Sequence, residues 1–394
     1  MEAGRSEPAL LPVSASRLLR FVKVTSIRDN FYKITGNITD TIERGTRSLG
    51  MAVSASPESA ATKSRSVVTE VCWLNRTVRS WADPRVLAEV AAEDSIERID
   101  VPRRLQPELK VSGKTVGASA FREKTGMTGK GIIVAVIDSE VALNHPALKG
   151  RVVHKANFTD ELWGNPDAHG TAVAGIIGSS DAIFAGMAPE ATIYNYKVLA
   201  SNESLTGDDF DAAIAIQQAL EDGAHIANCS WGAGPATDGK SREAKACDTA
   251  WDLGLILVKS AGNRGPGLKT CTTPADADGV IVVGATGQDG AKVQSYSSRG
   301  TAAGKKRPHL VAPGGFEDAA GMTSCLVGGG FGDVGFGTSY AAPHVSGLAA
   351  LLVQHDPART PDDVRDLLIS ACKKLAAGNA NVQGKGLVSL LRLN

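Results

Sequence analysis

Three residues of types that can carry out acyl-transfer chemistry lie far apart in this chain. Asp138 ends the apolar run IIVAVID, His169 opens the segment HGTAVAGIIGS, and Ser339 lies within GTSYAAPHVSG. Acyl transfer of this kind needs a nucleophile, a base that takes its proton and an acid that orients the base. Each residue type is also common in purely structural roles, so the surroundings of each residue must decide whether it is catalytic.

A fourth residue could stabilise the negative charge that develops in such a reaction. Asn263 in SAGN can donate from its side chain, and the backbone N–H of Ser339 can supply a second donor. Ser339 precedes the apolar helical run LAALLVQH, and free N–H groups collect at a helix N-terminus. Pro343 would cost about 3 kcal/mol inside a helix. Near the helix start its missing N–H costs little, so we expect Ser339 in the first turn.

The elements that must position these residues follow from the apolar runs after residue 130. GIIVAVID, ATIYNYKVL, AHIANCSW, LILVKSAGN and GVIVVGAT alternate with helical segments such as DDFDAAIAIQQALEDG and SREAKACDTAWDLG. This alternation predicts an α/β fold with a doubly wound, mostly parallel sheet. Ligands of such sheets bind outside the carboxyl ends of the strands. We therefore expect Asp138, Ser230 and Asn263 along one edge of the sheet.

Four motifs of the chain resemble the subtilisin family of serine endopeptidases and occur in the order of that family. They are VIDSEVALNHPALKG, HGTAVAG, SAGN and GTSYAAPHVSG, and the resemblance covers residues 115 to about 375. It implies a subtilisin-like sheet and a peptide or protein substrate. It also implies that Asp138 orients His169, that His169 is the general base and then acid, that Ser339 is the nucleophile, and that Asn263 stabilises the oxyanion.

The resemblance further implies how a substrate binds. NCSWG resembles a strand that pairs with an extended peptide by β-addition, and SAG would form the opposite wall of the specificity pocket. Thr272 would lie near the pocket floor. No acidic residue is evident there, so we expect a neutral or apolar residue before the scissile bond. The substrate-binding residues implied are Ser230, Trp231, Gly232, Ser260, Ala261, Gly262 and Thr272.

The region before the catalytic domain has its own organisation. Residues 1–16 are expected to be disordered, and 17–110 to form a small α+β domain with strands at 17–27, 67–74 and 95–102 and a helix at 83–94. Residues 103–114 read as a linker, and 111–394 as the catalytic domain. The small domain resembles the family's propeptides, which assist folding and then inhibit the active site. Self-cleavage is then expected between residues 100 and 116, and the chain would be a zymogen.

Two departures from the family pattern carry expectations. Glu140 stands two residues after Asp138, where the family usually has glycine. It would either favour the imidazolium form of His169 or simply point to solvent. The segment SSDAIFA is shorter than the Asn-rich loop of relatives that bind calcium tightly, and calcium needs six to eight oxygen ligands. We therefore expect no metal or other cofactor.

Alternative functions were considered beside the protease. Gly234–Ser241 fits the P-loop pattern of an NTPase, and Gly330–Gly335 fits GxGxxG, but no later strand ends in an acid suited to magnesium. A non-catalytic relative that only binds peptides is the other alternative. The remaining histidines lack the spacing of a zinc site, and His344 reads as a packing residue.

Bulk composition narrows the class of protein and its surroundings. Lys+Arg and Asp+Glu both number 42, so the formal net charge of zero favours no nucleic-acid partner. No apolar segment is long enough for a membrane span, and no signal peptide is recognisable. The six cysteines, at 72, 229, 247, 271, 325 and 372, are expected to be reduced thiols. These features predict a cytoplasmic protein, or a secreted one if the start is mis-assigned.

Overall fold

The chain divides into two compact units, Met1–Pro102 and Arg103–Asn394. A computed structural model describes residues 115–393, apart from 202–206, 320 and 377, together with six strands between residues 21 and 107. In the first unit five strands form one sheet in the order β3-β4-β1-β2-β5. They are β1 (Phe21–Arg28), β2 (Phe31–Ile38), β3 (Ser66–Cys72), β4 (Thr77–Ala82) and β5 (Ile96–Asp100).

The strands predicted in this unit are confirmed by β1, β3 and β5, whereas β2 and β4 were not predicted. The helix predicted at 83–94 and the disordered segment predicted at 1–16 lie outside the described residues.

A nine-stranded sheet forms the centre of the second unit, in the order β18-β19-β15-β14-β13-β11-β7-β9-β8. Its neighbouring strands run parallel, except for the antiparallel pair β18–β19. The strands are β7 (Ile133–Asp138), β8 (Val152–Asn157), β9 (Thr192–Lys197), β11 (Ile226–Cys229), β13 (Ile256–Ser260), β14 (Ile281–Thr286), β15 (Leu310–Pro313), β18 (Cys372–Lys373) and β19 (Leu387–Val388).

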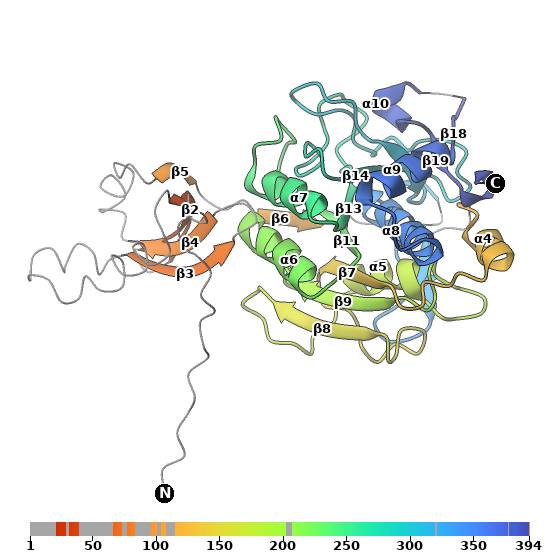
Figure 1. Ribbon diagram of the computed structural model, residues 1–394, viewed down its shortest axis with the longest axis horizontal. Helices are drawn as coiled ribbons and strands as arrows, with labels where there is room; N and C mark the ends of the chain where they lie inside the picture. Colours follow the sequence, from red (N-terminus) through yellow and green to blue (C-terminus); the bar gives the residue numbers. More distant parts are fainter. Residues whose placement is uncertain are drawn as a thin grey trace, which may run out of the picture. The chain divides into compact units, whose positions relative to one another are not determined.

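Helices cover both faces of this sheet. Figure 1 shows α6 and α7 on one side of the strand row and α5 and α8 on the other. The helices are α4 (Ala118–Thr125), α5 (Ala168–Gly178), α6 (Asp209–Glu221), α7 (Arg242–Asp252), α8 (Thr338–His355), α9 (Pro361–Ser370) and α10 (Ala380–Gln383), with a 3-10 turn at Leu390–Arg392. The predicted doubly wound, mostly parallel α/β fold is confirmed. None of the described helices is long and apolar enough to cross a membrane.

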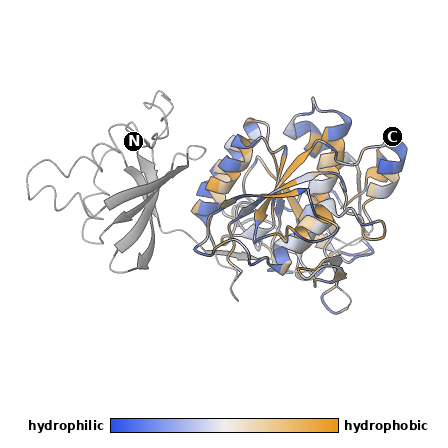
Figure 2. Ribbon diagram, turned by 90° about the horizontal axis from the view of Figure 1, so that it is seen from below, coloured by the Kyte–Doolittle hydropathy of each residue, from blue (hydrophilic) through white to orange (hydrophobic). Residues whose placement is uncertain are grey.

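The burial pattern explains why these segments become strands and helices. Strands β11, β13, β14 and β15 are buried at every position, as expected for parallel strands covered on both faces. Figure 2 shows the central strands in the hydrophobic colour and hydrophilic faces on the helices around them. Asp167, Asp208 and Ser241 cap the N-termini of α5, α6 and α7 with their side chains.

A small three-stranded sheet, β10-β6-β12, lies beside the central one in the chain's second unit. It consists of β6 (Arg104–Pro107), β10 (Gly207–Asp208) and β12 (Trp231–Gly232). The prediction that residues 103–114 are only a linker is therefore wrong, because β6 pairs antiparallel with both of its neighbours. The backbone N–H and C=O groups of β6 pair with the edges of the short strands β10 and β12. A hairpin of β16 (Thr323–Cys325) and β17 (Phe331–Asp333) completes the described strands.

Candidate active site

A buried carboxylate–imidazole pair lies at the carboxyl edge of the central sheet. Asp138 is the last residue of β7, and His169 is the second residue of α5. Asp138 Oδ1 lies 2.6 Å from His169 Nδ1, and neither residue is more than 1% exposed. An imidazole held this way keeps its proton on Nδ1 and can accept one on Nε2. The pair thus has the arrangement of an orienting acid and a general base.

The start of α5 is held against the end of β7 by short-range contacts. The Asp167 carboxylate accepts hydrogen bonds from His169 N at 2.8 Å and from Ser139 Oγ at 3.0 Å. A Cβ atom on Gly170 would lie 2.5 Å from the carbonyl oxygen of Ser139. Only glycine lets the helix approach the strand this closely, which explains the glycine after His169.

Ser339 lies in the first turn of α8 and bonds reciprocally with Ser230. Ser339 Oγ donates to the Ser230 carbonyl at 3.0 Å, and Ser230 Oγ donates to the Ser339 carbonyl at 2.6 Å. In a regular helix that second carbonyl would accept the N–H of residue 343, but Pro343 has none. Ser230 therefore replaces the missing helical bond, and the two bonds hold Ser339 against the segment that follows β11.

The helix starts that carry His169 and Ser339 also contact each other. The rings of His169 and Tyr340, the residue after Ser339, lie 5.6 Å apart between centroids. Tyr340 is buried, and burial raises the pKa of its phenol well above the usual value, so the ring remains neutral. Asp138, His169 and Ser339 thus lie near one another at this edge of the sheet.

The Asn263 side chain has its oxygen anchored and its amide nitrogen pointing the other way. Asn263 Oδ1 accepts from the Thr338 backbone N–H at 2.8 Å and from Thr338 Oγ1 at 2.9 Å. Thr338 Oγ1 in turn accepts from Gly262 N at 3.1 Å. Because these bonds fix the carbonyl end of the amide, its N–H₂ group is free to serve as the oxyanion donor that the sequence suggested.

The predicted substrate-binding residues gather at the same edge. Trp231 and Gly232 form β12, but the Trp231 indole donates to the Ile137 carbonyl at 2.9 Å and is fully buried, so it anchors the strand. The opposite wall is fixed by Thr272, whose N–H donates to the Ala261 carbonyl at 3.0 Å. Thr272 Oγ1 also lies 3.2 Å from the position of a Cβ on Gly262, which places Thr272 under that wall.

One residue of this region was missed by the sequence analysis. Lys259 in LILVKSAGN was read only as part of a strand, yet its side chain is fully buried and its Nζ lies 3.4 Å from Thr272 Oγ1. The signal that could have revealed it is a lysine inside an otherwise apolar buried run, directly before the wall segment.

The expectation that Glu140 points to solvent is wrong. Its side chain is 2% exposed, so it does not point to solvent, and it pairs with Lys197 Nζ at 3.3 Å. Glu140 Oε1 also accepts the N–H of Gly164 at 2.8 Å. Glu161 lies on the other side of Lys197 at 3.0 Å. Glu140 therefore fastens the loop before α5 to the end of β9, and its negative charge is directed toward Lys197.

The loop with the P-loop pattern has its backbone donors already engaged. One carboxylate oxygen of Asp276 accepts from Thr237 N at 2.8 Å and from Gly239 N at 3.1 Å. Lys240 is 75% exposed and pairs with Asp238. A carboxylate thus fills the place where a phosphate would bind. The GxGxxG match falls in the β16–β17 hairpin, which is no strand-to-helix turn.

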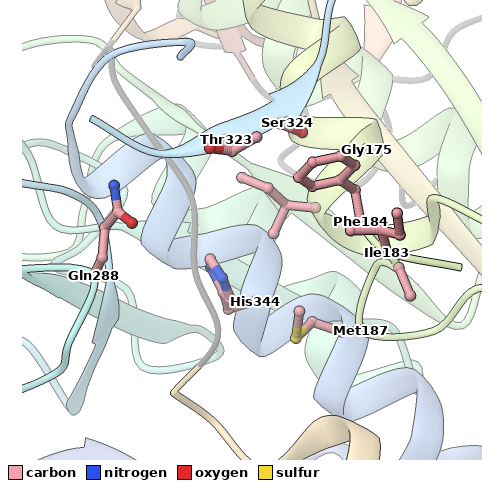
Figure 3. A pocket seen from close by; sticks show the side chains of 10 residues that line it. Gly175, Ile183, Phe184, Met187, Gln288, Thr323, Ser324 and His344 are labelled. Carbon is pink, nitrogen blue, oxygen red and sulfur yellow. The ribbon is translucent and has the colours of Figure 1, made fainter. Parts of the chain in front are cut away.

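His344 lies on α8 away from the Asp138–His169 pair. Its Nδ1 is 2.7 Å from the Tyr340 carbonyl of the same helix. Figure 3 shows its ring beside a pocket of about 310 Å³, with Ile183, Phe184 and Met187 across from it. This placement agrees with a packing role. Within the described part of the chain, no three His, Cys, Asp or Glu side chains gather in a way that could hold a metal ion.

Comparisons with known proteins agree with this geometry. The model of the Subtilase family matches residues 129–386. The serine protease AprX of Bacillus subtilis (strain 168) is 31% identical over 341 residues, covering 78% of this chain and 76% of AprX. Subtilisin DY of Bacillus licheniformis is 33% identical over 272 residues, covering 67% of this chain and 91% of the subtilisin. Among solved structures, the prenylagaramide maturation protease PagA is similar with a TM-score of 0.59 and 28% identity, covering 70% of this chain and 96% of PagA.

Proposed function

The chain belongs to the subtilase family and is a serine endopeptidase, and we propose that it hydrolyses peptide bonds through an acyl-enzyme on Ser339. The observation that carries this proposal is the buried Asp138–His169 pair at 2.6 Å, with Ser339 held at the start of the neighbouring helix. Asp138, His169 and Ser339 then act as one catalytic triad.

In the first step Ser339 Oγ attacks the carbonyl carbon of the scissile bond. The hydroxyl turns from the Ser230 carbonyl toward His169 Nε2, which takes its proton, and Asp138 stabilises the imidazolium through Nδ1–H. The tetrahedral oxyanion is met by Asn263 Nδ2 and by the backbone N–H of Ser339, which lies in the first helical turn.

The second half of the reaction returns every group to its starting state. His169 gives its proton to the leaving amine, the C–N bond breaks, and the acyl group remains on Ser339. Water then loses a proton to His169 and attacks the ester, and His169 reprotonates Ser339 Oγ as the acid product leaves.

We propose further that the chain processes its own N-terminal region and is inhibited by it until then. Strand β6 supports this, because it lies between β10 and the wall strand β12 and pairs antiparallel with both. A peptide substrate would be expected to pair in the same place by β-addition. Self-cleavage is then expected between residues 100 and 116.

The two alternative functions have less support. A P-loop NTPase would need the backbone donors that Asp276 already occupies. A peptide-binding relative without activity would have no need for an oriented imidazole or for an amide fixed like that of Asn263. Neither alternative accounts for the geometry at the carboxyl edge of the sheet.

The test compares the intact mass of the wild type with that of Ser339→Ala, each treated with a fluorophosphonate serine probe. We expect the wild type to lose its N-terminal region and its large fragment to take the label, whereas Ser339→Ala stays whole and unlabelled. Lys240→Ala, at the exposed lysine of the P-loop pattern, is the matched control and should behave like the wild type. A wild type that takes the label but stays whole would contradict the proposed self-processing. A wild type that neither takes the label nor cleaves any peptide would contradict the proposed catalytic triad.

A further inference from the structure

Lys259 is a fully buried lysine directly before Ser260, the first residue of the predicted wall of the specificity pocket. It is the fourth residue of β13, and its side chain has no measurable exposure. Lysine is almost never fully buried, because removing an ammonium group from water costs several kcal/mol. Lys259 therefore introduces a positive charge into the sheet at a position where a purely structural residue would more readily be apolar.

The ammonium group contacts two residues that the sequence predicts in the wall and near the floor of the specificity pocket. Lys259 Nζ donates to Ser260 Oγ at 3.0 Å, to the Ser260 carbonyl, and to Thr272 Oγ1 at 3.4 Å. Ser260 begins one wall, and Thr272 lies directly under Gly262 of the same wall. Ser260 Oγ is also 3.5 Å from the carbonyl of Cys229, the residue before Ser230 of the opposite wall. The charge therefore lies against one predicted wall, and Ser260 links that wall to the strand that leads into the other.

The register of β6 indicates which residue of a bound peptide strand would meet this pocket. Gln106 is paired with Gly232, and Pro107 with Trp231. A peptide strand bound in this antiparallel register would have its next residue opposite Ser230. Ser230 is the residue whose carbonyl lies 3.0 Å from Ser339 Oγ. A bound strand that continues in this register would present the carbonyl of that next residue to the nucleophile, and the sequence has glutamate at 108 and leucine at 109, directly after β6.

We propose that Lys259 gives this peptidase a preference for an acidic residue, glutamate above all, before the scissile bond, and that its first substrate is its own Glu108–Leu109 bond. The inference rests on the proposed function, and it replaces the neutral or apolar preference expected from the sequence. A carboxylate entering the pocket meets a dehydrated ammonium group together with the hydroxyls of Ser260 and Thr272. A charge-assisted hydrogen bond in such a site is stronger than a neutral one, so glutamate is favoured over its neutral isostere glutamine.

The first experiment measures kcat/KM on peptides that differ only at the residue before the scissile bond: Glu, Gln, Leu or Lys. We expect wild type to cleave after Glu about tenfold or more faster than after Gln. Lys259→Met, which keeps the length of the side chain without its charge, should lose that ratio and gain on Leu. Lys240→Met, at an exposed lysine, is the matched control and should keep the wild-type ratio.

The second experiment leaves the buried lysine in place, in case Lys259→Met fails to fold. Glu108→Gln should slow self-cleavage about tenfold, Glu108→Lys should slow it further, and sequencing of the mature wild type should begin at Leu109. An equal rate for Glu108→Gln, a different first residue, or faster cleavage after Leu or Lys than after Glu would overturn the inference. Labelling by the fluorophosphonate probe separates the two proposals: an enzyme that labels but ignores glutamate retains the proposed function, and one that never labels loses both.

Discussion

At the scale of the residue, we expect Asn263 to stabilise the transition state much more than the bound substrate. Its Oδ1 is held by Thr338, so the donor end of the amide stays in one orientation. We expect Asn263→Ala to lower kcat about 10²–10³-fold with little change in KM; this is the value measured for the equivalent donor of a subtilisin, which we borrow. Steady-state kinetics on a peptide substrate measures it. A rise in KM with kcat intact would show that Asn263 binds the ground state instead.

The second prediction at the residue scale concerns the contribution of Glu140 to stability. Glu140→Ala leaves the fully buried ammonium of Lys197 with Glu161 and the Leu162 carbonyl, and breaking such a buried pair costs about 3 kcal/mol. The free energy of unfolding in urea, measured in a Ser339→Ala background to prevent self-cleavage, should fall by that amount. Glu140→Ala combined with Lys197→Met should recover most of the loss, because the unpaired charge is gone. Equal losses in the single and the double variant would argue against this account.

At the scale of the element, the sequence predicted most of the central sheet but not its edges. The runs GIIVAVID, ATIYNYKVL, AHIANCSW, LILVKSAGN and GVIVVGAT became β7, β9, β11, β13 and β14. These strands are buried on both faces, so nearly every side chain is apolar and the run stands out. Strands β8, β15, β18 and β19 were not predicted. Strand β8 is partly exposed and contains His154 and Lys155, whereas the other three have only two to four residues.

The start of α8 shows why part of the site could not be predicted. The residue types and order of the motif indicated a serine in the first turn of a helix that tolerates Pro343. The donor that replaces the missing bond, Ser230, stands 109 positions earlier in the chain. Lys197, the partner of Glu140, likewise lies on a different strand. Local pattern determines the element, whereas contacts between distant segments depend on the sheet order that brings them together.

The loop 179–187 after α5 yields a prediction about metal dependence. Arg122 of α4 donates from Nη1 to the carbonyls of Gly186 and Met187, both at 2.9 Å. Asp181 accepts from the N–H groups of Ile183 and Phe184 at 2.8 Å, so its carboxylate serves the loop itself. We propose that the guanidinium does for this loop what a bound cation does in calcium-dependent relatives, and that no metal is needed.

Removal of metal ions and substitution of Arg122 should therefore differ in their effect on stability. A chelator such as EDTA should leave the Tm of Ser339→Ala unchanged. Adding Arg122→Met should lower its stability by about 2 kcal/mol, since charge-assisted bonds to two carbonyls are lost. Lys124→Met, at an exposed lysine of the same helix, is the control and should have no effect. A Tm that falls with EDTA, and returns with calcium, would contradict the proposal.

At the scale of the whole molecule, two histidines join the beginnings of neighbouring strands in the same way. His309 donates its N–H to the Val282 carbonyl, and its Nδ1 accepts the Val282 N–H, both at 2.9 Å. His225 makes the same pair of bonds to Ile133, at 3.0 and 3.1 Å. Each ring thus acts as an extra backbone acceptor at the amino ends of the central strands. Nδ1 can accept only while it carries no proton, so these bonds require neutral imidazoles.

The neutral state of His309 makes the stability of the fold depend on pH in a definite direction. Burial, with Arg307, Arg365 and Lys305 nearby, lowers the pKa of His309 to about 3, and burial also lowers that of His225. In the unfolded chain a histidine takes up its proton near pH 6.5. Below that pH the unfolded state binds more protons than the folded state, so stability is complete above about pH 6.5 and declines as the pH falls toward 3.

The quantity to measure is the slope of the free energy of unfolding against pH. His309 alone should remove up to about 1.4 kcal/mol per pH unit between pH 6 and 4, read from urea unfolding of Ser339→Ala at each pH. His309→Asn keeps an acceptor for Val282 N–H without a titrating ring, so the curve should become shallower by that amount. His355→Asn, exposed at the end of α8, is the matched control. If the two substitutions flatten the curve equally, the acid sensitivity does not come from the strand-joining ring but from carboxylates that lose their partners on protonation.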